Sequence, residues 1–270
     1  MGTPTRFDQV QANAFLGAIP EASPFNSIWY VDVTNGSNGN DGTSPSSAKA
    51  SIASAIAAGL AGDTFIIAPG TYTVTAAIVP LARQIFRAAV MVPKNPTVII
   101  TGNIADMVTV DVDGVQFHGL EFKASGATAD NLIDVSDTAS SNGLVFNGCT
   151  FNGADQTSVI GINANDATFF PTGMVVTNCL FRDLTGTHIN IGAKGMPYAH
   201  IAYNTFAIDI DSGTAIALAD TSAFATGKGF VIEHNDFTGF DATANEVGIT
   251  IAGTENTTGA GMIRNNYFAY

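Results

Sequence analysis

A short phrase ending in phenylalanine recurs six times in the second half of this 270-residue chain. Its copies end at Phe122, Phe151, Phe181, Phe206, Phe237 and Phe268, so that successive copies are 25 to 31 residues apart. Recurrence at this spacing is typical of a solenoid, because one such unit cannot bury its apolar face alone and must stack on its neighbours. The sequence therefore predicts a stack of similar turns.

Aligning the copies on the final phenylalanine gives each position a physical meaning. The residue five positions earlier is always apolar: Phe117, Phe146, Val176, Ile201, Ile232 and Ile263. The next position is mostly polar, as at His118 and Glu233, which is the period of two of a half-buried strand. A second short strand is expected after each phrase, as in residues 133–135, 160–162 and 189–191, one above the other. These patterns predict an all-β parallel coil with turns about 4.8 Å apart.

The position two before each phenylalanine is expected to lie at an inward bend. It holds Leu120, Cys149, Cys179, Asn204, Asn235 and Asn266. Stacked asparagines can bond their amides to one another and to the backbone of the turn. The two cysteines fall in adjacent turns, which favours two reduced buried thiols and leaves a disulfide as the alternative.

The first half of the chain contains three less regular stretches. Residues 35–45 are rich in Gly, Asn and Asp, and they predict a plain turn rather than a calcium loop. Residues 46–61 predict a helix with Ile52, Ile56 and Leu60 on one stripe, covering the open N-terminal end of the coil. Residues 76–93 fit either a longer strand or a short helix.

The order YVD at residues 30–32, a loop, a helix and GDTFIIAPGTY at residues 62–72 resembles the opening of the pectate-lyase-like superfamily. The resemblance covers about residues 29–270 and implies a single-stranded right-handed parallel β-helix with an N-terminal capping α-helix. The aligned turns occupy about residues 97–270. This fold carries lyases, hydrolases, epimerases, phage tailspikes and inert spikes, so it implies no single function.

Residues 1–28 form an apolar but irregular leader, predicted to be an extended arm that packs on its own coil or on another subunit. No secretory signal opens the chain, and no run approaches the ~18 apolar residues of a membrane helix. The formal charge of −13 disfavours nucleic acid as a partner. For the same reason a uronate polymer would need bound cations or a local basic cleft. No cofactor and no metal site is predicted.

No familiar catalytic motif such as GxSxG, HExxH or CxxC occurs in the sequence. The candidate catalytic pair is Asp209 and Asp211, since alternate residues of a strand share one face at about 7 Å. Two solvated turn carboxylates are the alternative. The candidate ligand-binding residues are Arg182, Asp183, His188, His200 and Tyr203.

Two other pairs are predicted to be structural. Glu121 and Asp236 share a column, but at four turns apart they are about 19 Å from each other. Glu233 and Arg264 should form a surface ion pair. Each histidine, where it binds no ligand, is expected to be exposed or in a turn.

The sequence favours a virion structural protein of a tailed phage, such as a spike, fibre or capsid-decoration subunit. The opening TPTRF at residues 3–7 also resembles that of such virion proteins. The β-helix would present a rigid surface to a host glycan, and residues 1–28 would bind other virion proteins. We expect a homo-oligomer, with a trimer as its form, located in the virion. The alternative is a polysaccharide-cleaving β-helix enzyme, either a hydrolase or a lyase.

Overall fold

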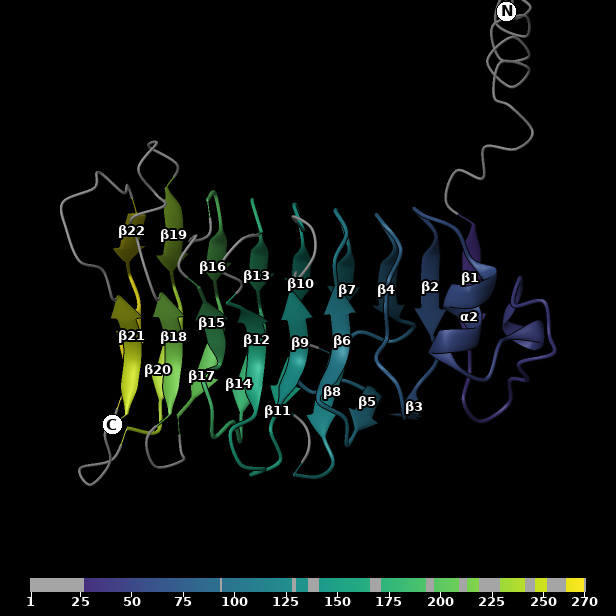
Figure 1. Cartoon of the computed structure of the whole chain (residues 1–270), viewed down its shortest axis with the longest axis horizontal. Coiled ribbons are helices and arrows are strands. Elements are labelled where there is room, and N and C mark those ends of the chain that lie inside the picture. Colours follow the sequence, from purple (N-terminus) through teal and green to yellow (C-terminus); the bar gives the residue numbers. More distant parts are fainter. Residues whose placement is uncertain are drawn as a thin grey trace, which may run out of the picture.

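The computed structural model describes residues 27–92, 94–127, 130–135, 141–165, 171–192, 197–208, 213–218, 229–240, 246–251 and 261–269. In these residues the strands form three parallel sheets, which are the three sides of an elongated coil of stacked turns (Figure 1). Neighbouring strands in a sheet come from successive turns, so each complete turn gives one strand to each sheet. The predicted all-β parallel coil is confirmed. Its right-handedness stays a prediction.

Sheet A comprises β1 (Ile28–Val31), β2 (Thr64–Ile67), β4 (Ile85–Ala88), β7 (Gln116–His118), β10 (Val145–Asn147), β13 (Val175–Thr177), β16 (His200–Ala202), β19 (Phe230–Glu233) and β22 (Gly261–Arg264). Sheet B comprises β3 (Gly70–Val74), β5 (Val98–Gly102), β8 (Leu120–Ala124), β11 (Thr150–Asn152), β14 (Leu180–Arg182), β17 (Thr205–Ala207), β20 (Asp236–Thr238) and β23 (Tyr267–Phe268). Sheet C comprises β6 (Asp106–Val110), β9 (Asn131–Val135), β12 (Ile160–Ala164), β15 (Ile189–Ile191), β18 (Thr214–Leu218) and β21 (Val247–Ile251).

The core is a set of columns in which like residues lie over like. On sheet A the register runs Phe117, Phe146, Val176, Ile201 and Ile232, all buried as predicted. On sheet B the final phenylalanines of the repeated phrase stack with ring centroids 4.5 to 5.6 Å apart. In the last described turn the residues of these columns are exposed to solvent, Ile263 by 42% and Phe268 by 52%.

The inward bend between sheets A and B carries the predicted ladder of amides. Asn204 Nδ2 donates to Asn235 Oδ1 at 3.0 Å, and Asn235 Nδ2 donates to Asn266 Oδ1 at 3.0 Å. The same amide nitrogens also donate to backbone carbonyls, that of Asn235 to Ile201 O at 3.0 Å. Cys149 and Cys179 are buried and free, so the predicted pair of reduced thiols is confirmed.

The residue just before each position of the inward bend has a left-handed backbone. These residues, which we call the turn edge, have φ between 53° and 68°: Gly119, Gly148, Asn178, Tyr203, His234 and Asn265. Glycine adopts this conformation freely, whereas a residue with a side chain is strained there. The chain needs one such residue to turn sharply from sheet A into sheet B.

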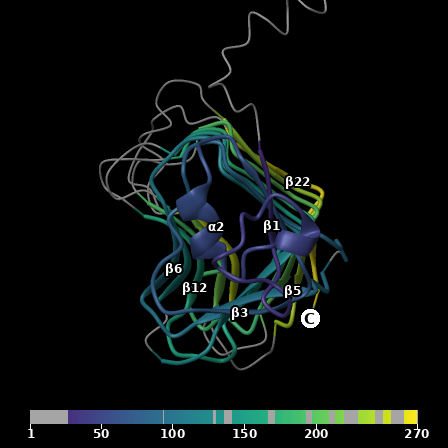
Figure 2. The same cartoon turned by 90° about the vertical axis from the view of Figure 1, so that its right-hand side faces the viewer.

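The helix is shorter than predicted. A 3₁₀ turn, η1 (Pro45–Ser47), precedes α2 (Ile52–Ala58), whose first N–H groups are capped by Ser51. Gly59 ends the helix by donating back to the carbonyls of Ala55 and Ile56, so the predicted stripe is wrong at Leu60, which is 54% exposed. Figures 1 and 2 show α2 at the β1 end of the coil. That it serves as a cap stays a prediction.

The structure also answers two further expectations, on residues 76–92 and on the register of sheet C. Residues 76–92 contain the strand β4 and no helix, and Arg83 has a left-handed backbone with φ 59°. On sheet C, Ile162 rather than Ile160 pairs with Ile133. The predicted alignment is thus two residues out, and Ile160 pairs with Asn131 at a partly exposed position.

The turn-rich loop is held by its own side chains. Asp32 Oδ1 accepts from the backbone of Thr34 and Asn35, and Asp41 Oδ1 accepts from Thr43 and Ser47. These bonds fit the predicted plain turn. No helix in the described part of the chain is long and apolar enough to cross a membrane.

Candidate functional site

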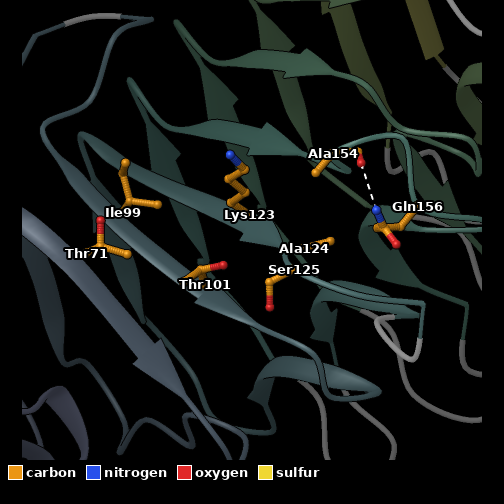
Figure 3. Close-up of a pocket in the computed structure, with 8 residues that line it drawn as sticks. All are labelled: Thr71, Ile99, Thr101, Lys123, Ala124, Ser125, Ala154 and Gln156. Atoms are coloured by element: carbon orange, nitrogen blue, oxygen red, sulfur yellow. Dashed lines mark hydrogen bonds between the residues drawn. The ribbon is translucent and has the colours of Figure 1, made fainter.

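A hollow of about 400 Å³ lies on the outer face of sheet B, over β3, β5 and β8 (Figure 3). We call it the sheet B hollow. It is lined by Thr71, Ile99, Thr101, Lys123, Ala124, Ser125, Ala154 and Gln156. The alternation of the strands produces it, because Tyr72, Ile100 and Phe122 point into the core and leave their neighbours outside.

Among the described residues that line the sheet B hollow, Lys123 has the only charged side chain. In Figure 3 it stands at the centre, with Thr71 and Ile99 on one side and Ala154 and Gln156 on the other. No hydrogen bond or ion pair joins its ammonium group to any residue that the structure describes. The hollow therefore offers a free cation amid hydroxyl and amide groups.

A network of charged and polar side chains adjoins this hollow. The register sets Lys123 beside Asn152 and Asn152 beside Arg182, on successive turns. Glu121, only 6% exposed, accepts from Asn152 Nδ2 at 2.8 Å and from Arg182 Nη2 at 3.1 Å. Arg182 Nη1 also lies 3.9 Å from Asp183 Oδ2. The guanidinium thus holds two carboxylates while its side chain stays 42% exposed.

A second hollow of about 410 Å³ lies where Met91, Val92 and Lys94 come close to the turn edge. This turn-edge groove is lined by Met91, Val92, Lys94, Gly119, Asn147, Gly148, Asn178 and Tyr203. The crossing is close, since a Cβ on Gly119 would come within 3.0 Å of Met91 Cγ. Lys94 Nζ donates to Thr205 Oγ1 at 2.6 Å, which brings its charge to the outer face of sheet B.

A third cluster surrounds Glu233 on the outer face of sheet A. Arg264 Nε donates to Glu233 Oε2 at 2.7 Å, which confirms the predicted ion pair. His200 Nε2 lies 3.0 Å from Glu233 Oε1, and the ring of His234 stacks on Tyr203 at 5.1 Å. The hydrogen bond from Arg264, followed by that from His200, lowers the pKa of Glu233. Glu233 is therefore a fixed anion that binds its own neighbours.

The predicted ligand-binding residues do not form one site. Arg182 and Asp183 lie at the C-terminal end of β14 in sheet B, Tyr203 lines the turn-edge groove, and His200 belongs to the Glu233 cluster. The candidate catalytic residues Asp209 and Asp211 lie outside the described residues.

The expectation that His188 is exposed or in a turn is wrong, because this side chain is fully buried, and its candidate ligand-binding role stays a prediction. Its ring stacks between Phe181 and Phe206, with centroids 6.1 and 6.0 Å away. Burial lowers its pKa to about 3, an effect only weakly opposed by the Leu184 backbone. Neither ring nitrogen makes a well-formed hydrogen bond with the described residues. His188 is a neutral core residue.

Sequence reasoning missed Lys94, Lys123, Asn147 and Asn178. Each stands at an outward or turn position of its own turn, where nothing distinguishes it from an ordinary surface residue. Only the register sets Lys123 among Thr71, Thr101 and Asn152. The predicted sharing of one column by Glu121 and Asp236 is confirmed through the intervening strands.

No family model matches the sequence, and no curated protein matches it. Among solved structures, a deglycosylated pectin methylesterase from Aspergillus niger aligns with TM-score 0.50 and 16% identity, over 90% of this chain and 85% of that one. A PL6-family alginate lyase aligns with TM-score 0.49 and 14% identity, over 92% of this chain. A rhamnogalacturonan lyase aligns with TM-score 0.42 and 16% identity, over 88% of this chain.

The chain spans 41% of the alginate lyase and 63% of the rhamnogalacturonan lyase. At these identities the likeness concerns the backbone. The chain shares the parallel β-helix fold of pectate-lyase-like proteins.

Proposed function

We propose that this chain binds a polysaccharide across the outer face of sheet B, with the sheet B hollow as the main contact. The observation that carries the proposal is the ammonium group of Lys123, which has no partner among the described residues and lies amid hydroxyl groups in a hollow of about 400 Å³. Ligand sites of this size combine apolar surface with a few polar groups that fix orientation. Here the methyl groups of Thr71, Thr101 and Ala154 supply the apolar part.

The charge distribution favours an acidic polysaccharide. Three of the ten Lys and Arg residues, Lys94, Lys123 and Arg182, lie on this one face. Glu121 and Asp183 offset the charge of Arg182, whereas Lys94 and Lys123 form no ion pair with any residue that the structure describes. The whole protein, at −13, repels polyanions, so a local cationic face is what a uronate polymer would require. The rigid sheet also loses little conformational entropy when a ligand binds.

The geometry supports binding more directly than cleavage. Arg182 is bonded to Glu121, and a guanidinium stays protonated, so it can orient a ligand but not accept a proton from it. Cleavage by a hydrolase or lyase is the alternative. The pectin methylesterase with the same fold is named for action on a polysaccharide. This name supports a polysaccharide as the ligand, whether the chain only binds it or also cleaves it.

The virion role predicted from the sequence stays a prediction, as do the oligomer, the location and the contacts of residues 1–28. The names of the structural neighbours favour the alternative, a polysaccharide-acting protein. Display of a rigid glycan-binding surface would suit a spike as well as an enzyme. Binding and turnover therefore have to be measured separately.

The test is calorimetric titration of the full chain with uronate polymers and with neutral polysaccharides. Lys123→Ala should weaken binding about tenfold, the effect of losing one hydrogen bond to a charged group. Lys49→Ala is the matched control, since Lys49 Nζ bonds only Asn38 O in a distant loop. Equal affinity of the two variants, or no binding of any polymer by the native chain, would overturn the proposal.

The same samples decide between binding and cleavage. Release of reducing ends or unsaturated sugars by the native chain, lost in Asp209→Asn and Asp211→Asn, would establish the cleaving alternative. Binding without turnover would establish a display or anchoring protein.

A further inference from the structure

The turn-edge groove has an unusual floor and end wall. Two glycines, Gly119 and Gly148, leave the first part of the floor without side chains. Two turns after Gly148, Tyr203 occupies the same left-handed position with φ 59° and is 54% exposed. A bulky residue in this conformation costs about 1 kcal/mol or more, which a glycine would avoid. The strained tyrosine lines the groove, and its ring stacks on that of His234.

The hydrogen bonds of the groove leave one donor and one acceptor free. Asn178 Nδ2 donates to Asn147 Oδ1 at 3.1 Å, and Thr177 Oγ1 donates to the same oxygen at 3.4 Å. Asn147 Nδ2 and Asn178 Oδ1 have no partner in the part of the chain that the structure describes. A neighbouring donor and acceptor match the carbonyl and the N–H of a secondary amide.

The remaining walls are apolar. Met91 and Val92 expose 39% and 37% of their surface, and both line the groove. The Lys94 ammonium group already donates to Thr205 Oγ1, so one of its donors is used inside the protein. The groove therefore combines an aromatic platform, an amide-matching pair and apolar contacts for a methyl group.

We propose that the turn-edge groove is a second saccharide site that selects a 2-acetamido sugar. The pyranose ring would stack on Tyr203, the acetamido N–H and carbonyl would bond Asn178 and Asn147, and the acetyl methyl would contact Met91 and Val92. The volume of about 410 Å³ lies in the range of small-ligand pockets. This inference extends the proposed function, since it adds a subsite of different chemistry beside the sheet B hollow.

The experiment titrates the full chain with three trisaccharides: tri-N-acetylchitotriose, its de-N-acetylated form and cellotriose. We expect tri-N-acetylchitotriose to bind at least tenfold more tightly than the other two. Tyr203→Gly should weaken its binding at least tenfold. Glycine already occupies this position in two turns, so the variant keeps the turn.

Tyr198→Gly is the matched control, because Tyr198 is also left-handed, with φ 60°, and is 59% exposed. Its affinity should equal that of the native chain. Equal binding of all three trisaccharides, or equal losses in the two glycine variants, would overturn the inference. Its failure is distinguishable from that of the proposed function, because polymer binding that depends on Lys123 is measured separately.

Discussion

The two halves of the coil have different interiors on the same backbone. In the first half the stacked columns are apolar, with Phe65, Phe86, Phe117 and Phe146 stacked at 4.9 to 5.4 Å. The buried Asp63 and Gln84 of this half both bond the backbone of Leu60 beside α2. In the second half the inward bend carries the amide ladder, and the neutral ring of His188 lies between phenylalanines.

The contrast shows what an inward position requires. An apolar side chain can occupy an inward column without any hydrogen-bond partner. A polar one can occupy it when the turns above and below supply hydrogen-bond partners, because an unpaired buried polar group costs free energy. Asn235 meets this condition fully, whereas His188 does not. The second half should therefore respond more strongly to substitution and to pH.

The largest expected effect is that of Asn235→Leu. The amide of Asn235 donates to Ile201 O and Asn266 Oδ1, and its oxygen accepts from the backbone and side chain of Asn204. Leucine would leave these buried partners unpaired, so we expect the free energy of unfolding to fall by about 4 kcal/mol. Urea unfolding followed by circular dichroism measures it. A loss below about 1 kcal/mol would show that the ladder is not required.

A smaller effect is expected on acidification, through His188. Its pKa is about 3 in the folded chain against an ordinary value of 6.5, so the unfolded chain takes up the proton first. Stability is therefore fully present above pH 6.5 and is lost as the pH falls toward 3. Between pH 7 and pH 5 the loss should be about 2 kcal/mol.

Unfolding of the native chain and of His188→Phe at both pH values isolates this contribution. The variant should lose about 2 kcal/mol less than the native chain. His234→Gln, a change at a partly exposed ring, should leave the loss unaltered. If the native chain and His188→Phe lose equal stability, the buried ring does not control the acid response.

The smallest effect is expected for Cys179→Ala, at the apolar position of the bend just before the amide ladder begins. The sulfur of Cys179 is buried, and its contacts to the carbonyls of Thr177 and Phe146, at 3.2 and 3.6 Å, are weak. Its removal should cost about 1 kcal/mol through lost packing. The backbone N–H of Cys179 still donates to Asn204 Oδ1, so the ladder below is kept. A cost as large as that of Asn235→Leu would remove the distinction between the halves.

Much of the fold could be predicted from the sequence because similar residue types recur at the same position of each turn. The columns of Phe146 and Phe151, and the ladder through Asn235, follow from the spacing alone. The error on sheet C arose because Ile160 and Ile162 fit the same apolar alternation in the sequence, whereas Ile160 pairs with Asn131 and is only partly buried. The helix was overextended because Leu60 continues an apolar spacing that Gly59 interrupts.

The candidate surfaces were far less accessible to prediction. Lys123 and Thr71 line one hollow although 52 residues separate them, and Lys94 bonds Thr205 across 111 residues. Such neighbours depend on the register and on where Met91, Val92 and Lys94 come close to the turn edge. Neither is encoded in a local pattern.

The sequence by itself determined the stacked coil, because a period of about 30 residues with fixed inward positions allows its apolar faces to be buried only in register. It also determined the amide ladder, since asparagines in one column have only one another and the turn backbone as partners. The tertiary structure alone decided the outer faces. There the free Lys123, the strained Tyr203 and the enclosed His188 owe their chemistry to neighbours from other turns, and no spacing within one turn specifies those neighbours.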